Sequence, residues 1–294
     1  MNTVSETARL RALSPSTPKG GRQIGAILID SGTITPRDAE EVLRLQKDRG
    51  LRFGEAAIKL GLISEADLHR VLASQYDYPY ITTEESKVSL ELVAAYRPSS
   101  PQVEMLRAIR SQLMLRWFTE SRKQLAVVSV ARGEGRSYLA ANLAVVFSQL
   151  GERTLLLDAD MRNPRQHALF GLEGSSGLST FLSGRANEPR LNRVPGLIDL
   201  SVLSAGPAPP NPQELAARPS FGHMLGELSQ QFDVIIIDTP AAETSADAQS
   251  LAVRAGGALL LARQDQTRLR AIAALTSAIR TTGGQIVGSV LARF

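Results

Sequence analysis

Three short apolar runs along the chain end directly in glycine or aspartate residues. They lie within 127–138, 155–162 and 234–240, and each is long enough for one buried strand. The first passes into a glycine-rich turn that opens a helix, whereas the other two end in aspartates. Parallel strands covered on both faces are almost wholly apolar, and their carboxyl ends meet at one edge of the sheet. The pattern therefore predicts an α/β fold in which these polar groups gather at that edge.

Downstream of residue 100, strand-like and helix-like segments alternate. The predicted strands are 125–130, 154–157, 200–203, 234–237, 258–262 and 286–291. The predicted helices are 103–117, 137–150, 221–231 and 269–281. This alternation favours a mostly parallel sheet with helices on both faces.

Composition limits the chemistry. With 294 residues, 43% of them apolar, the chain can form one large domain and a small one. The absence of cysteine excludes disulfides, cysteine-bound zinc and thiol catalysis, and the three scattered histidines argue against a histidine metal site. No apolar run approaches the roughly 20 residues of a membrane span, and the N-terminus lacks the apolar core of a signal peptide. We therefore expect a cytoplasmic protein without a membrane span of its own. The net charge of +4 suits an anionic ligand, but this signal is weak.

A sequence repeat lies near the N-terminus. Residues 23–46 and 52–75 align without a gap, and eight of the 24 positions are identical. Each unit reads as a short helix that stops at a glycine, then an isoleucine, then a second helix capped by Thr35 or Ser64. A glycine inside the first helix is costly unless some group approaches the backbone closely. The pattern predicts a small, mainly helical module.

This repeat resembles the twin motif in the N-terminal domain of type II secretion ATPases, the MshEN domain, which binds cyclic di-GMP. The resemblance implies cyclic di-GMP as an effector. The candidate positions for it are Gln23, Gly25, Gly32, Gln46, Arg52, Gly54, Gly61 and Gln75. Gln23 stands where that motif has arginine, and losing a guanidinium weakens bidentate binding of phosphate. A docking or purely structural module is the alternative.

The glycine-rich turn at 133–135 is the predicted phosphate-binding loop. Its glycines allow successive backbone N–H groups to face one anion, and the following helix adds its own N-terminal N–H groups. The predicted ATP-binding residues are Gly133, Glu134, Gly135, Arg136, Ser137 and Tyr138. The segment departs from a regular Walker A motif, because Val130 replaces the first glycine and Arg136 replaces the lysine. Arginine keeps the positive charge in a bulkier, planar group.

Aspartates follow two of the predicted strands, Asp158 and Asp160 after one and Asp238 after another. A single aspartate in that position is often a turn cap. Three of them after a glycine-rich loop predict a Mg²⁺–nucleotide site, with Ser137, Asp158 and Asp238 as the metal ligands. A dinucleotide-binding fold is the weaker alternative, because Tyr138 occupies its third glycine position and two of the aspartates would have no role.

Residues 101–294 resemble the cytoplasmic catalytic domain of bacterial tyrosine kinases (BY-kinases), more closely the chain-length-determinant autokinases of exopolysaccharide export. The matching segments are 133–137, 155–160, 162–164, 209–212, 235–238 and 247–248. The resemblance implies Mg²⁺-dependent transfer of a phosphoryl group from ATP to tyrosine. It also implies that Asp158 or Asp160 helps to accept the tyrosine proton, and that Arg136 acts in place of the phosphate-binding lysine.

The predicted helix at 103–117 carries Glu104, Arg107 and Arg110 at three-residue spacing. They match the oligomerisation motif of these kinases, and a solvated charged face is the alternative. The resemblance implies a homo-oligomer and an activating partner in the membrane, a polysaccharide copolymerase or chain-length regulator at the inner face of the inner membrane. No nucleic acid is expected, because Ala131 stands where the related partition ATPases have a second lysine.

Two functions stay open. These kinases usually carry a phosphorylated tyrosine-rich tail, but the printed sequence has no tyrosine after Tyr138, so we expect any target tyrosine in a partner. This feature and Arg136 favour the rival, a catalytically impaired module that binds nucleotide and cyclic di-GMP and controls polysaccharide export by assembly. The predicted organisation is a tail at 1–20, the repeat domain at 21–82, a linker at 83–100 and the nucleotide-binding domain at 101–294.

Overall fold

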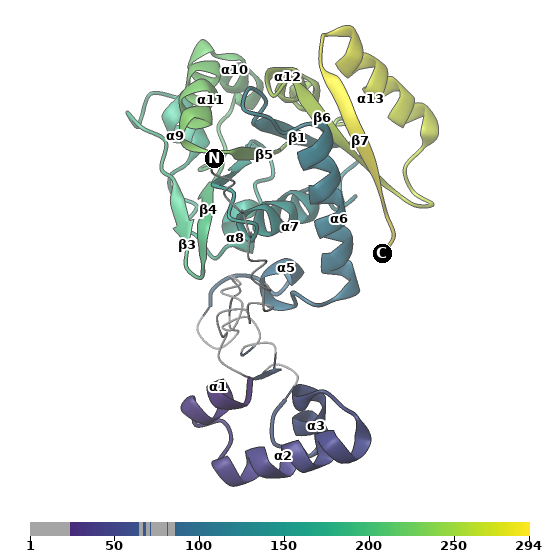
Figure 1. Ribbon diagram of the computed structural model, residues 1–294. Coiled ribbons are helices and arrows are strands. Elements are labelled where there is room, and N and C mark those ends of the chain that lie inside the picture. Colours follow the sequence, from purple (N-terminus) through teal and green to yellow (C-terminus); the bar gives the residue numbers. More distant parts are fainter. Residues whose placement is uncertain (1–23, 65–66, 69–70, 72–80, 82–85) are drawn as a thin grey trace, which may run out of the picture. The chain divides into compact units, whose positions relative to one another are not determined.

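The computed structural model describes residues 24–64, 67–68, 71, 81 and 86–294, and the chain divides into two compact units, Met1–Tyr78 and Pro79–Phe294 (Figure 1). Each unit is described by itself. The candidate ligand positions Gln23 and Gln75 and the predicted tail at 1–20 lie outside the described residues.

The N-terminal unit is helical over its described part. Its helices α1 (Ile24–Asp30), α2 (Pro36–Arg49) and α3 (Phe53–Lys59) surround a small core that includes the fully buried Leu28 and Val42. Thr35 caps α2 as predicted: its Oγ1 accepts a hydrogen bond from the Asp38 backbone N–H at 3.3 Å, and Asp38 Oδ2 accepts one from the Thr35 N–H at 2.7 Å. The reciprocal bonds satisfy N–H groups that the helix itself leaves unpaired.

Packing within this unit explains the glycines inside the first helix of each repeat. A Cβ at Gly25 would lie 3.0 Å from the ring of Phe53, and one at Gly54 would lie 2.4 Å from Leu68. The close approach to the backbone that the sequence predicts is therefore made by side chains of the same unit. Of the other candidate ligand positions, Gly32 and Gly61 follow the first helices with left-handed backbone, Arg52 is exposed and Gln46 is half-buried.

The C-terminal unit is built on a seven-stranded sheet of order β3-β4-β2-β5-β1-β6-β7. Its strands are β1 (Gln124–Ser129), β2 (Thr154–Asp158), β3 (Asn192–Val194), β4 (Leu197–Leu203), β5 (Val234–Asp238), β6 (Gly257–Arg263) and β7 (Gln285–Ala292). Neighbouring strands are parallel except for β3, which pairs antiparallel with β4. In Figure 1, β3 and β7 form the two outer edges.

Helices cover both faces of this sheet. They are α5 (Val93–Tyr96), α6 (Pro101–Arg116), α7 (Arg136–Ser148), α8 (Gln166–Leu169), α9 (Leu178–Leu182), α10 (Pro212–Ala217), α11 (Pro219–Gln231), α12 (Asp247–Arg254) and α13 (Leu269–Thr281). Side chains alternate along β1, so that Leu125 and Val127 pack with α5 to α8 whereas Ala126 and Val128 pack with α9 to α13. The predicted α/β fold, a mostly parallel sheet with helices on both faces, is confirmed.

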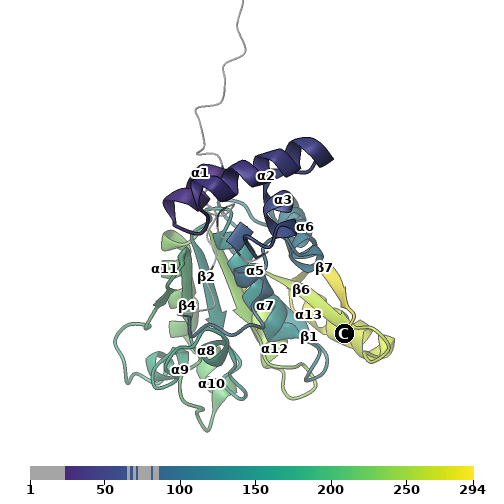
Figure 2. The same ribbon diagram turned by 90° about the horizontal axis from the view of Figure 1, so that it is seen from below.

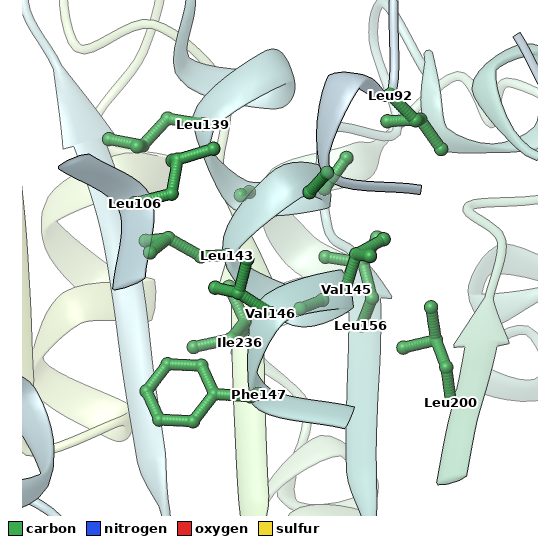
Figure 3. Packing of buried hydrophobic residues seen from close by; sticks show 14 of the residues in the cluster. Leu92, Leu106, Leu139, Leu143, Val145, Val146, Phe147, Leu156, Leu200 and Ile236 are labelled. Atoms are coloured by element: carbon green, nitrogen blue, oxygen red, sulfur yellow. The ribbon is translucent and has the colours of Figure 1, made fainter. Parts of the chain in front are cut away.

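The helix α7 is the most deeply buried of the helices on the face that α5 to α8 cover. It lies against the central strands with α5 and α6 beside it (Figure 2). Leu143, Val146 and Phe147 of α7 point into the cluster that also contains Leu156 of β2 and Ile236 of β5 (Figure 3). Most of its side chains are buried, so burial fixes the helix and with it the loop that precedes it. No helix in the described part of the chain has the length and apolar character of a membrane span.

Candidate functional site

The loop between β1 and α7 has a backbone that only glycine adopts readily. Gly133 and Gly135 have φ angles of 78° and 91°, in the left-handed region. Gly135 is the N-cap of α7 and offers no side chain to the first-turn N–H groups. These groups therefore remain available to an anion, as in other helix N-termini that bind phosphate.

Side chains hold the loop in this shape. The buried Glu134 carboxylate accepts hydrogen bonds from the Ala131 N–H at 2.9 Å and from the Thr267 hydroxyl. Glu243 accepts one from the Arg132 N–H, also at 2.9 Å. Glu134, which the sequence predicts to bind ATP, thus holds the loop in shape through its side chain. Tyr138, the last residue of that predicted set, accepts a hydrogen bond from Gln102 of α6 at 2.8 Å.

Arg136 turns towards the aspartates. Its side chain is 8% exposed, and its guanidinium donates to Ser129 Oγ at 2.9 Å and to Asp160 Oδ2 at 3.3 Å. Its Nε lies 3.4 Å from Asp238 Oδ1. The arginine at the Walker A lysine position is therefore the counter-charge of two of the predicted site carboxylates.

The three predicted aspartates meet at the carboxyl ends of two central strands. Asp158 of β2 and Asp238 of β5 are register partners, and both are fully buried. Asp158 accepts backbone hydrogen bonds from Asp160, Arg165 and Gln166 at 3.2, 3.1 and 2.9 Å. Asp160 accepts from the N–H groups of Arg162 and Asn163 at 3.2 and 2.9 Å. The carboxylates are thus rigidly oriented by the turn after β2.

Burial shifts the acidity of the central pair. It raises the pKa of Asp158 well above its ordinary value, and the neighbouring Asp238 adds to the effect. Burial also raises the pKa of Asp238, against the opposing influence of Arg136, Gln166 and Ser137. Two adjacent buried carboxylates favour either a proton or a cation between them.

The donors at this edge fit Mg²⁺ bound together with a nucleotide. Among the described residues, no group of three or more histidine or acidic side chains is arranged to hold a metal on its own. Mg²⁺ usually takes one or two carboxylates and completes its shell with phosphate oxygens and water. Asp238 Oδ1 is buried and accepts no hydrogen bond, and Arg136 Nε lies 3.4 Å from it. An oxygen so placed suits a cation: it faces Arg136 in this structure and would suit a hard cation such as Mg²⁺ if the arginine turned away.

Gln166, at the start of α8, is a site residue that the sequence did not predict. Its Nε2 donates to Asp238 Oδ2 at 2.7 Å and to the Ser137 carbonyl at 3.1 Å, so it links β5 to α7. A lone glutamine eight positions after Asp158 gives no recognisable signal, because its role depends on strands that are adjacent only in the folded chain.

The residues predicted for oligomerisation lie on α6. Glu104 and Arg107 form an ion pair within the helix, and the Glu104 side chain is 61% exposed. Arg110 instead donates to the Val146 carbonyl of α7 at 2.8 Å. Glu104 is therefore exposed and Arg107 half-buried, while Arg110 ties α6 to the helix that follows the glycine-rich loop.

Comparison with known proteins relates this site to a kinase family. No protein-family model matches the chain. Over 195 residues it is 35% identical to CapB of Staphylococcus aureus, covering 66% of this chain and 86% of CapB. It is 33% identical over 206 residues to the tyrosine-protein kinase YwqD of Bacillus subtilis, covering 70% of this chain and 87% of YwqD. The solved kinase domain of the Escherichia coli tyrosine kinase ETK is 27% identical, with a TM-score of 0.64, over 68% of this chain and 78% of that domain.

Proposed function

The chain belongs to the bacterial tyrosine-protein kinases, and from this premise we propose that it transfers a phosphoryl group from ATP to tyrosine with Mg²⁺, in exopolysaccharide biosynthesis or export. The observation that carries the proposal is the convergence of three parts: the loop at Gly133–Gly135, the cation Arg136, and the carboxylates Asp158, Asp160 and Asp238. Phosphoryl transfer depends mainly on positioning and charge stabilisation, which is what these parts supply.

In this proposal the loop N–H groups around Gly135 hold the phosphates. Ser137, Asp158 and Asp238 hold Mg²⁺, which when bound neutralises negative charge on the transferring group. Arg136 leaves the carboxylates and pairs with a phosphate, to which its fork of donors is well matched. The tyrosine hydroxyl passes its proton to Asp158 or Asp160, whose carboxylates are oriented by backbone hydrogen bonds of the turn after β2.

The rival function is a regulator that binds nucleotide without turnover. It is favoured by one observation: Arg136 is engaged with Asp160 and Asp238, so that binding of the metal requires the site to rearrange. Planar arginine does not reproduce the point charge of the usual lysine. Such a protein would control polysaccharide export through nucleotide-dependent assembly.

We propose that assembly involves α6, with Glu104 and Arg107 of one copy facing a second copy. Support comes from the exposed Glu104, from its ion pair with the half-buried Arg107, and from Arg110, which connects the same helix to α7. A membrane-embedded chain-length regulator is the proposed activator, and it would bring this chain to the inner face of the membrane.

The twin-repeat unit is the proposed sensor of cyclic di-GMP. Support is the repeated sequence pattern and the exposed Arg52, whereas the packing roles of Gly25 and Gly54 also suit a purely structural module. Calorimetry of the full chain with cyclic di-GMP separates the two, with Arg52→Ala as the variant that should abolish binding. Heat of binding that is unchanged in Arg52→Ala would contradict this assignment of the site.

The kinase proposal is tested by incubating the purified chain with ATP, Mg²⁺ and the cytoplasmic segment of its membrane partner. We expect a phosphotyrosine signal that disappears in Asp158→Asn and persists in Asp199→Asn, a matched change on β4 outside the site. Nucleotide binding without any phosphotyrosine would select the regulator. Absence of nucleotide binding would contradict both functions.

A further inference from the structure

Gln166 contacts all three predicted Mg²⁺ ligands. Its side-chain Nε2 donates to Asp238 Oδ2 at 2.7 Å and to the Ser137 carbonyl at 3.1 Å. Its backbone N–H donates to Asp158 Oδ2 at 2.9 Å. These partners come from β5, α7 and β2, which are brought together only by the fold.

The chemistry of the carboxamide suits this position. A carboxamide carries two N–H donors and one acceptor oxygen on the same planar group. Donation to a carboxylate and a carbonyl fixes its orientation, because the reverse orientation would place Oε1 against two other oxygens. Glutamate would repel Asp238, and an apolar residue of similar size would remove this donor from both acceptors.

Two buried oxygens at this place accept no hydrogen bond from the described residues, Gln166 Oε1 and Asp238 Oδ1, and the second of them faces the Arg136 cation, with Nε at 3.4 Å. Buried acceptors are nearly always hydrogen-bonded, so such atoms need an explanation. Because Gln166 occupies Asp238 Oδ2, the other oxygen of that carboxylate is the one left for a cation. Gln166 Oε1 is in turn an acceptor for a donor such as metal-bound water.

We propose that Gln166 is a positioning residue for the metal: it fixes the Asp238 carboxylate so that Oδ1 faces Mg²⁺, and it ties Asp158 and Ser137 to the same point. The inference rests on the proposed function, since it assumes that Mg²⁺ and nucleotide bind here. It assigns Gln166 no contact with the reacting atoms. Partners that orient metal ligands typically change metal affinity or activity by about 10- to 100-fold when they are removed.

The test measures ATP binding to the full chain by calorimetry at a series of Mg²⁺ concentrations and in EDTA. In Gln166→Leu we expect the Mg²⁺ concentration for half-maximal enhancement of ATP binding to rise at least about tenfold. Binding in EDTA should change little, because the loop N–H groups are untouched. The matched control is Gln149→Leu, which removes another buried carboxamide whose Nε2 bonds the Ala94 carbonyl away from the site. Melting temperatures of both variants report whether they fold.

Phosphotransfer adds a second measurement. The Mg²⁺ requirement should increase in Gln166→Leu, while kcat at saturating Mg²⁺ should fall less than it does in Asp158→Asn. If Gln166→Leu does not fold, Gln166→Asn keeps the carboxamide on a shorter stem and should show the same shift in Mg²⁺ dependence. A folded Gln166 variant with wild-type Mg²⁺ dependence overturns the inference while leaving the kinase proposal intact. If the chain binds ATP but does not turn it over, the kinase proposal is overturned, while the binding measurements still test the role of Gln166. If ATP binding to the wild-type chain does not depend on Mg²⁺, the inference about Gln166 is overturned.

Discussion

At the scale of single residues, Arg136 distinguishes this site from a regular Walker A loop. Its guanidinium lies among Ser129, Asp160 and Asp238 at distances of 2.9 to 3.4 Å. A buried ion pair is weak support for stability, because desolvation offsets the attraction, yet removal of one partner leaves an uncompensated buried charge. Arg136 therefore matters to the folded state, and in the proposed function it also matters to phosphate binding.

Replacement of Arg136 separates charge from shape. We expect Arg136→Ala to weaken binding of Mg²⁺-ATP by at least about tenfold, or about 1.4 kcal/mol, because a charged partner of the phosphates is lost. Arg136→Lys keeps that charge and should remain close to wild type. Calorimetry measures both, with Arg193→Ala on the exposed strand β3 as control. Wild-type affinity in Arg136→Ala would show that the side chain does not reach the nucleotide.

Asp158 makes the stability of the folded protein depend on pH. Since burial raises the pKa of Asp158 in the folded state, the folded protein binds the proton more tightly than the unfolded chain does. The contribution of this group to stability is therefore present below its ordinary pKa, near 3.8, and is lost as pH rises towards the raised value. Asparagine does not ionise, so Asp158→Asn should not lose stability in this way as the pH rises.

The difference in melting temperature, Asp158→Asn minus wild type, should accordingly rise from pH 4 to pH 8. The measurement is thermal unfolding without nucleotide or metal at several pH values. Because a constant loss of hydrogen bonds in the variant affects all pH values alike, only the slope of the difference decides the outcome. If this difference in melting temperature does not change with pH, ionisation of Asp158 has no cost to folding.

At the scale of elements, Gly257 at the start of β6 packs tightly against Trp117 at the end of α6. A Cβ at Gly257 would lie 2.5 Å from the ring of Trp117, whose Nε1 donates to the Gln124 carbonyl at 2.8 Å. We expect Gly257→Ala to destabilise the protein by about 1–3 kcal/mol through overpacking. Gly226→Ala on α11 is the matched control: nothing lies within 4 Å, and it should stabilise by up to about 1 kcal/mol. Urea unfolding compares them, and equal midpoints would contradict the packing argument.

Long, strongly patterned elements were predictable from sequence. The runs at 234–237 and 269–281 agree with β5 and α13 to within a residue, because continuous apolar runs and helical spacing are local signals. The strand β3 was not predicted, since Asn192–Val194 is short, mostly polar and defined only by pairing with β4. The helices α8 and α9 span four and five residues, too few for a periodic pattern.

The candidate site shows the same division. Asp158 and Asp238 could be found because each ends an apolar run, and the fold makes these two runs neighbours. Gln166 and the inward turn of Arg136 could not be found, because their contacts join residues that are up to 102 positions apart in the chain (Arg136 to Asp238). The glycines of the repeat were recognised as places of close approach, but only the structure identified Phe53 and Leu68 as the groups that approach.

At the scale of the whole molecule, the chain consists of two separately compact units. The phosphate loop, Arg136 and all three site aspartates belong to the second, Pro79–Phe294, together with the helix α6.

A chain of residues 79–294 should therefore fold and bind Mg²⁺-ATP within about threefold of the full chain, because a compact unit keeps its own core. Calorimetry and thermal melting provide the comparison. Loss of binding in the shortened chain, while it still melts cooperatively, would show that the N-terminal unit contributes to the nucleotide site. Loss of the melting transition itself would contradict the division into independent units.

The inward position of Arg136 also bears on whether the stability of the fold depends on a metal ion. Many small metalloproteins collapse when a chelator strips their ion, because the ion is part of their folded architecture. Here an arginine from the chain itself is within 3.4 Å of the acidic cluster. Because Arg136 balances the charge of Asp160 and Asp238, we expect the folded chain to keep its melting temperature in EDTA.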